Sequence, residues 1–236
     1  MSQEETTSRI LEAAGQVFAD RGFKAATIRD ICSKADVNLA SVNYHFGDKQ
    51  RLYIATIKHA HQLPSSQFPI PQWHAETSPE TKLADFIQVT LSRMIPKGKA
   101  PWQAKLMMRE MTQPTLAVQE LIKEYIRPHF DLLLSILRQL VAKQTSEQQL
   151  TKLGFSIIGQ CLFYRFNQPV LHMLVDEEMV DQHFSIEQLA QHITHFSLLA
   201  IRHFTEEPND PSSILSTPIT EQYSIGTESN TNLPEN

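Results

Sequence analysis

The chain has 236 residues, enough for one or two domains with cores of their own, and its hydrophobic and charged fractions of 41% and 20% are ordinary for a globular protein. Only seven glycines occur, which argues against nucleotide-binding enzyme folds, because their turns need glycine to let the backbone approach phosphate. The net charge is −5, but the first 60 residues hold eight Lys or Arg against seven Asp or Glu, so a weakly basic head precedes an acidic body.

The first eight residues are polar and show no hydrophobic signal region, and no apolar run is long enough to cross a bilayer. These features favour a cytoplasmic protein with no membrane partner. Cys32 and Cys161 lie far apart inside apolar helical patterns. In a cytosolic protein they are expected to be reduced, buried thiols, and a disulfide or redox switch is the alternative.

Helical periodicity covers almost the whole chain up to residue 205, and strand signals are nearly absent, so the predicted fold class is all-α. A first helix is expected over residues 8–21, where it meets a glycine. Thr27 and Asn38 are suited to cap two short helices of about two turns each, and a further helix begins at Lys49.

A run of prolines between residues 64 and 79 is the best domain boundary in the chain. The expected organisation is a three-helix unit over 1–63, a Pro-rich linker over 64–79, a larger helical domain over 80–205 and an acidic tail over 206–236. The tail is expected to be disordered, because it cannot bury enough apolar surface to offset chain entropy. Helices of the larger domain are expected at about 80–95, 102–111, 115–143, 147–166 and 185–204, with Pro128 kinking or splitting the third.

The segment from Thr27 to Lys49 predicts two short helices around a tight turn, behind a longer first helix, which is helix-turn-helix geometry. A small shared core can form from Ile28, Ile31, Val37, Val42 and Phe46. The outer part of the second helix then presents Asn38, Leu39, Ser41, Asn43, Tyr44 and His45. By spacing alone, such a polar face is equally compatible with an ordinary structural helix pair.

The stretch from Ile10 to Leu52 resembles the N-terminal DNA-binding domain of TetR/AcrR-family transcriptional regulators, over about a fifth of the chain. The shared features are Phe18-Ala19-Asp20-Arg21-Gly22-Phe23, then Thr27-Ile28-Arg29-Asp30-Ile31, then Tyr44-His45-Phe46 followed by Lys49. The sequence departs from the family pattern at Asp36, where glycine is common, and at Asn43, where tyrosine is usual.

The resemblance implies that Thr27 and Lys49 contact phosphates, one at each end of the motif, and that Tyr44 and His45 pack on the sugar-phosphate backbone. The residues implied to face base edges are Asn38, Leu39, Ser41 and Asn43. An asparagine can pair with adenine through two hydrogen bonds. The predicted partners are double-stranded operator DNA and a small-molecule effector of unknown identity, which would release a repressor from a palindromic operator.

Similar proteins use a variable second domain to dimerise and to bind an effector, and residues 109–115 and 163–169 resemble one subgroup, the CecR-like regulators. Met and aromatic side chains between residues 80 and 166 favour a deformable apolar pocket, with ordinary core packing as the alternative. The candidate effector-binding residues are Trp102, Met107, Met111, Phe130, Phe163, Tyr164 and Arg165.

Apolar residues recur at helical spacing in segments 147–166 and 185–204, which favours a four-helix interface in a homodimer. The alternative is that these stripes face the subunit's own core. The predicted interface residues are Leu150, Gly154, Ile158, Cys161, Ile186, Leu189, Ile193, Phe196 and Ala200. A homodimer would place two heads on the two half-sites of a palindrome.

Neither a metal nor a cofactor is predicted: His192 and His195 share a helix face, but no fourth ligand has a recognisable spacing. An enzyme is not expected either, because the sequence has no nucleophile elbow, phosphate loop or metalloprotease helix. The remaining alternative is a helical module that binds protein, or a small molecule, rather than DNA.

Overall fold

The computed structural model describes residues 3–95 and 102–206, and all regular structure within them is helical, as the sequence predicts. The elements are α1 (Gln3–Ala25), α2 (Ile28–Ala35), α3 (Leu39–Phe46), α4 (Lys49–Gln67), α5 (Pro79–Met94), α6 (Trp102–Thr112), α7 (Ala117–Leu121), the π-helical turn η1 (Ile122–Ile126), α8 (Arg127–Leu140), α9 (Glu147–Phe166), α10 (Gln168–Leu174), α11 (Glu177–His183) and α12 (Ile186–Glu206). Beyond Glu206, the predicted acidic tail lies outside the described residues. In the described part, no helix is both long and apolar enough to cross a membrane.

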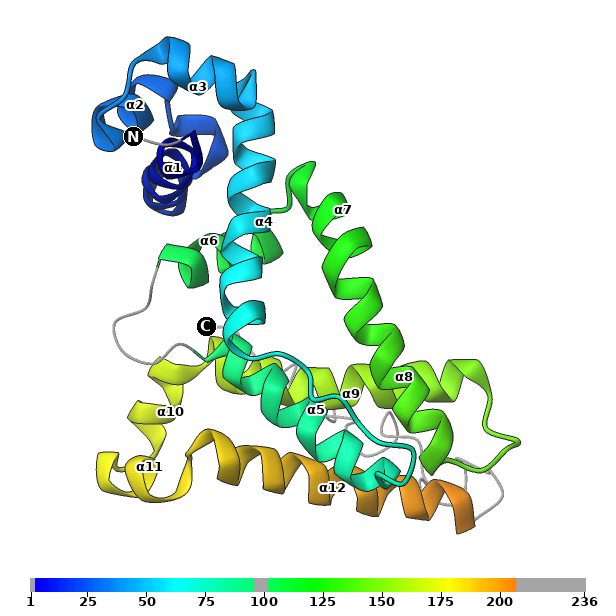
Figure 1. The fold of residues 1–236 in the computed structure, drawn as a ribbon. Helices are drawn as coiled ribbons and strands as arrows, with labels where there is room; N and C mark the ends of the chain where they lie inside the picture. Colours follow the sequence, from blue (N-terminus) through cyan, green and yellow to red (C-terminus); the bar gives the residue numbers. More distant parts are fainter. Residues whose placement is uncertain (1–2, 96–101, 207–236) are drawn as a thin grey trace, which may run out of the picture.

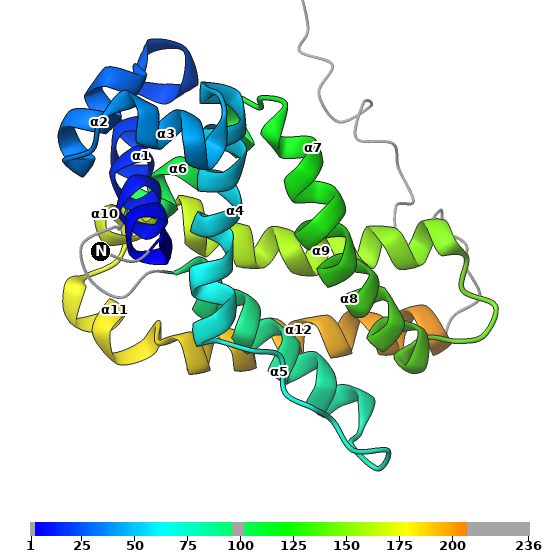
Figure 2. The same cartoon turned by 45° about the horizontal axis from the view of Figure 1, so that its top comes forward.

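The helices pack around two hydrophobic cores. Figure 1 and Figure 2 show how these helices are arranged, with α1, α2 and α3 at one end of the molecule. The head core lies between α1, α2, α3 and α4, where the rings of Phe18 and Tyr53 meet edge to face at 4.8 Å. The body core lies between α5, α8, α9 and α12 and includes the fully buried Phe86 and Leu137. Helix α4 extends from the head to α5 and so connects the two cores.

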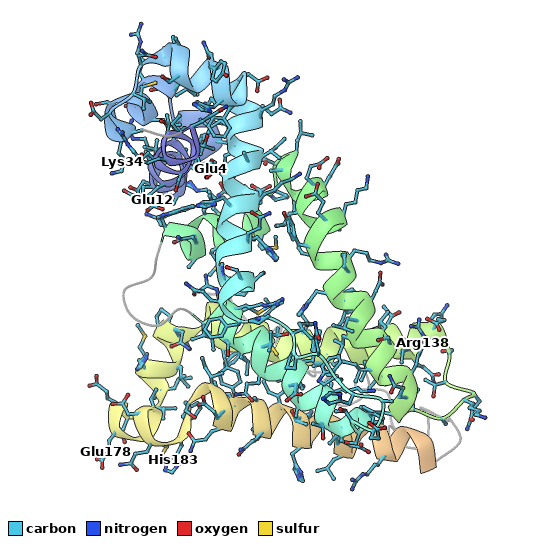
Figure 3. The ribbon with its side chains drawn as sticks, viewed as in Figure 1. Glu4, Glu12, Lys34, Arg138, Glu178 and His183 are labelled. Carbon is cyan, nitrogen blue, oxygen red and sulfur yellow. The ribbon has the colours of Figure 1, made fainter. Side chains whose placement is uncertain are left out.

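Helix α6 follows α5 in the chain but packs on the head. Leu106 of α6 and Leu121 of α7 are fully buried in the head core. The ring of Trp102 lies so close to Gly15 of α1 that an added Cβ would come within 2.2 Å of it. The Trp102 indole N–H also donates to Glu12, at 2.6 Å (Figure 3 labels Glu12 on α1). Two helices that follow α5 in the chain thus complete the head.

Helix boundaries differ from the predicted ones at glycine and proline. Helix α1 begins at Gln3, earlier than predicted, and its helical backbone breaks at Gly22, where φ is 75° and glycine is favoured. Helix α4 continues through Pro64 to Gln67, although a proline removes one N–H from the ladder of hydrogen bonds and crowds the preceding turn. Just before Pro128 the backbone forms η1, so the long predicted helix is divided into α7, η1 and α8.

Two short helices, α10 and α11, occupy a region for which no helix was predicted. Each has only seven residues, too few to establish a helical period in the sequence. Most of their apolar side chains are exposed, including Met173 and Leu174, while Leu171 is buried.

Candidate nucleic-acid interface

Side chains at the start of α2 and α3 fix where these helices begin, as predicted. The Thr27 hydroxyl accepts a hydrogen bond from the Asp30 N–H, and the Asp30 carboxylate accepts one from the Thr27 N–H, which completes a capping box. Asn38 caps α3 by accepting a hydrogen bond from the Ser41 N–H at 2.8 Å. Between the helices, Asp36 adopts a left-handed conformation with φ of 50°, which aspartate tolerates in place of the usual glycine.

The inner faces of α2 and α3 pack on the head core. Ile31 and Val42 are fully buried, and Ile28, Val37 and Phe46 are partly buried against the same cluster. The small core predicted for the motif is therefore confirmed, and it leaves the opposite face of α3 toward solvent.

Two arginines of α1 tie the helix-turn-helix to the first helix. Arg9 Nη2 donates to the backbone carbonyls of Ala35 at 2.5 Å and Asp36 at 3.1 Å. Arg21 Nη1 donates to the Asp30 carboxylate at 2.6 Å. Hydrogen bonds from Thr27, together with the Arg21 charge, lower the pKa of the Asp30 carboxyl. The role of Arg9 was not predictable from the sequence, because a hydrogen bond to a backbone carbonyl distant in sequence leaves no local motif.

The outer face of α3 exposes side chains that the subunit does not cover. Tyr44 is 77% exposed and Leu39 is 53% exposed, and Asn43 is also exposed. The Asn38 side-chain oxygen, by contrast, is occupied by hydrogen bonds from the N–H and hydroxyl of Ser41. Because the cap occupies that oxygen, Asn38 is less suited to pair with adenine than Asn43, whose amide has no hydrogen-bond partner within the described residues.

Two other predicted DNA contacts have partners inside the head. The Nδ1 of half-buried His45 lies 3.1 Å from the Thr7 hydroxyl. The Lys49 ammonium donates to the Lys24 carbonyl at 3.3 Å and lies 4.9 Å from the centre of the Phe23 ring. His45 and Lys49 therefore help to anchor α3 and α4, and their contacts with DNA stay predictions.

The residues predicted to bind an effector lie in different surroundings within the subunit, and their contact with an effector stays a prediction. Trp102 and Met107 pack on the head core, and Phe130 and Tyr164 pack on the body core. Met111 and Phe163 are exposed. Arg165 donates a hydrogen bond to the Ala104 carbonyl of α6. Helical spacing identifies the side chains that share one face of a helix, but not the faces of different helices that meet.

A cluster of basic side chains that the sequence did not predict lies between α4, α5 and α8. It consists of His61, Arg93 and His129 and is called the Arg93 cluster below. Burial, and next the Arg93 charge, lower the pKa of both histidines to about 4, so both are neutral near pH 7. The three residues stand on separate helices, so the only local signal is a polar residue within an otherwise apolar helical pattern.

The apolar stripes of α9 and α12 point mainly into the subunit's own core, and the predicted role of their residues in a dimer stays a prediction. The predicted interface residues found in the body core are Leu150, Gly154, Cys161, Leu189 and Ile193. Burial raises the pKa of the Cys161 thiol to about 12, and both cysteines are unpaired. Of the rest, Ile158, Ile186 and Ala200 are half-buried and Phe196 is 57% exposed.

Two protein-family models match the chain. "Bacterial regulatory proteins, tetR family" matches residues 10–56, and "HTH-type transcriptional dual regulator CecR, C-terminal domain" matches residues 79–201. The HTH-type transcriptional dual regulator CecR of Shigella flexneri is 22% identical over 177 residues, which cover 71% of this chain and 79% of that protein. The HTH-type transcriptional repressor Rv3405c of Mycobacterium tuberculosis is 44% identical over 57 residues, which cover 24% of this chain and only 30% of that protein.

Solved structures share the fold over most of the chain. The crystal structure of AibR in complex with isovaleryl coenzyme A and operator DNA has a TM-score of 0.56 and 16% identity, and the match covers 81% of this chain and 97% of AibR. The helix-turn-helix geometry and the two family models together show that this chain belongs to the TetR family of bacterial regulatory proteins and carries a C-terminal domain of the CecR type.

Proposed function

We propose that this protein is a DNA-binding transcriptional repressor that acts as a homodimer and leaves a palindromic operator when a small-molecule effector binds. The observation that carries the proposal is the helix-turn-helix, whose α3 exposes Leu39, Asn43 and Tyr44. The names of the relatives support it, since they include a transcriptional repressor and a dual regulator. Contact with chromosomal DNA would place its action in the cytoplasm.

In this proposal α3 enters the major groove and Asn43 reads a base. Its exposed amide keeps a donor and an acceptor, which are the two groups that pairing with adenine requires. Tyr44 packs on the sugar-phosphate backbone beside it. Thr27 and Lys49 stand at the N-terminal ends of α2 and α4, where helix dipoles favour a phosphate.

Two subunits would join through the outer faces of α9 and α12. Phe155, Gly159 and Phe163 are exposed at intervals of four residues on α9, and an added Cβ at Gly159 would meet nothing within 4 Å. Phe196 and Leu199 are more than half exposed on α12. Covering these side chains with a second copy would bury them in a four-helix interface, made largely by residues other than those predicted from the sequence.

The effector signal would reach the head through α4 and α6. The Tyr53 hydroxyl of α4 donates to the buried Glu110 of α6 at 2.7 Å, and Glu110 also accepts from the N–H and hydroxyl of Thr115, at 2.8 and 2.9 Å. A displacement of α6 would therefore move α4 and the head with it. An effector with a tenfold preference for the released conformation shifts the equilibrium by about 1.4 kcal/mol.

The test is a titration of the purified protein on DNA flanking its own gene, at two salt concentrations, with random DNA as competitor. Binding should be sequence-selective and should weaken steeply with salt, because cationic contacts release counterions from DNA. Asn43→Ala should lose about 1–3 kcal/mol of discrimination at one base of each half-site. Gln148→Ala, which removes an exposed amide on α9, is the matched control and should bind as the wild type does.

Binding no better than to random DNA, unaltered in Asn43→Ala, would reject the proposal and favour a helical module that binds protein. Phe196→Asp tests the dimer separately. It should give a monomer by sedimentation and weaken operator binding, since a single head contacts one half-site. A dimer that persists in this variant would contradict the proposed interface.

A further inference from the structure

The Arg93 cluster brings three basic groups together from separate helices. His61 lies on α4, Arg93 near the end of α5 and His129 in the first turn of α8. The Arg93 charge acts on both histidines, and His61 also acts on His129. Geometry places the three side chains together: His129 Nε2 lies 2.9 Å from the Thr90 hydroxyl, about one turn before Arg93 on α5, and the His61 ring lies 4.5 Å from that of Tyr125, about one turn before His129.

Arg93 has no acidic partner in the described part of the chain. Its Nε donates to the Phe68 carbonyl at 2.8 Å, but none of the ion pairs within residues 3–95 and 102–206 includes it. Burial lowers the pKa of Arg93, yet a guanidinium remains charged at any physiological pH. A partly buried cation without a counterion costs free energy, so this site favours an anion from outside the chain.

The two imidazoles present ring nitrogens beside this charge. His61 Nδ1 is buried and has no hydrogen-bond partner within the described residues. The Thr90 hydroxyl gives its single hydrogen to the Phe86 carbonyl at 2.7 Å, so it accepts from His129 Nε2 at 2.9 Å. The neutral His129 therefore carries its proton on Nε2, and its Nδ1 can take up a further proton when an anion is near.

We infer that the Arg93 cluster binds the head group of the effector, and that the effector is a small organic carboxylate with an apolar body. This inference rests on the effector control proposed above. One carboxylate matches the single fixed charge of Arg93, whose terminal nitrogens have no partner within the described residues and can hold both oxygens. Aromatic rings flank the site, since Phe86 stacks on His129 at 4.3 Å and Tyr125 lies 4.5 Å from the His61 ring.

The position of the cluster gives such a ligand a direct mechanical path to the head. His61 is near the C-terminal end of α4, and the N-terminal end of the same helix follows α3 after the Asp48 cap. Arg93 belongs to α5, which packs in the body core. A carboxylate held by both residues changes how α4 sits on α5, and a rigid helix transmits that change to the DNA-binding face.

The experiment is isothermal titration calorimetry of the full chain, without DNA, with hexanoate and hexanamide as probes. These two molecules share an apolar body and differ in charge. Hexanoate should bind on the order of tenfold more tightly than hexanamide, because charge-assisted hydrogen bonds are the stronger kind. Arg93→Gln should remove that preference and Arg93→Lys should restore most of it. Arg138→Gln, which removes an exposed arginine paired with Glu147, is the matched control and should behave as the wild type does.

Three results would overturn the inference. They are equal affinity for the two probes, no binding of hexanoate, and an unchanged affinity of Arg93→Gln for hexanoate. Saturable binding of inorganic phosphate in place of hexanoate would overturn the carboxylate assignment. If circular dichroism shows that Arg93→Gln does not fold, His61→Asn replaces it in the comparison of the two probes. The His61 Nδ1 has no hydrogen bond within the described residues to lose, so this variant should fold. The calorimetry contains no DNA, so the two proposals can fail separately. A protein that binds no operator would contradict the proposed regulator function alone. A protein that binds DNA but not hexanoate would contradict the carboxylate site alone.

Discussion

Two polar sites in the interior differ in how fully their hydrogen bonds are satisfied. At the Glu110 site, formed by Tyr53, Glu110 and Thr115, a fully buried carboxyl group accepts three hydrogen bonds. At the Arg93 cluster, among residues 3–95 and 102–206, the cation has one hydrogen bond, to a backbone carbonyl, and the neighbouring His61 Nδ1 has none. A network whose hydrogen bonds are all formed holds helices together, whereas polar groups left without partners can bind a ligand.

The largest expected effect of a single substitution comes from breaking the satisfied site. Glu110→Leu leaves the Tyr53 hydroxyl and the Thr115 N–H without an acceptor in the core. We expect the free energy of unfolding to fall by about 3–5 kcal/mol, measured by urea denaturation. Glu178→Leu, which removes an exposed carboxylate on α11 (Figure 3), should change it by less than about 0.5 kcal/mol. A similar small change in Glu110→Leu would contradict the structural role.

Acidification should destabilise the Arg93 cluster next. The pKa of His61 and His129 is about 4 in the folded chain against a usual 6.5, so the unfolded chain binds protons first as the pH falls. Their contribution to the free energy of unfolding is fully present above pH 6.5 and is lost between 6.5 and 4, by about 2–3 kcal/mol for each histidine.

Denaturant titrations across this range measure the effect, and the double variant His61→Asn with His129→Asn should flatten it. Carboxyls with lowered pKa, such as those of Asp30 and Glu124, lose their contribution at lower pH, below their usual 3.8 and 4.5. If the free energy of unfolding of the double variant still falls with pH above pH 5, groups other than these two histidines cause the pH dependence.

The Glu110 site forms only when α6 packs against α1, because Glu110 belongs to α6. A substitution at Gly15 of α1 tests this packing. In Gly15→Ala the new Cβ would lie 2.2 Å from the Trp102 ring, so the ring must move and the free energy of unfolding should fall by about 2 kcal/mol. Gly159→Ala has open space at its Cβ and is the matched control. In the isolated subunit it should stabilise α9 by about 0.5–1 kcal/mol, and thermal melts of both variants measure the contrast.

The smallest expected effect on stability comes from removing the unpaired cation. Arg93→Leu loses one bond to the Phe68 carbonyl but also an uncompensated charge, so the free energy of unfolding should stay within about 1 kcal/mol of the wild type. Hexanoate binding should be lost in the same variant. The same urea titration provides the check. If Arg93→Leu loses as much stability as Glu110→Leu, Arg93 is a structural residue and the two sites do not differ in this respect.

Features that depend on neighbours in the chain were predictable from the sequence. Thr27 and Asn38 cap the helices that were expected to follow them, and α9 has the predicted bounds of Glu147–Phe166. The inner core of the helix-turn-helix followed from the period of 3.6 residues, and Ile31 and Val42 are buried accordingly. All of these involve atoms within about one helical turn, so the residues that decide them stand close together in the sequence.

Only the tertiary structure decided which helix faces meet. It placed Trp102 of α6 on the head, turned Leu150 and Ile193 into the body core, and assembled the Arg93 cluster from three helices. An apolar stripe specifies that a helix face is buried but not what buries it, since the hydrophobic effect has no direction. The sequence by itself therefore determined the helices and the DNA-binding motif, while the residues that would bind an effector and face a second subunit depended on long-range packing.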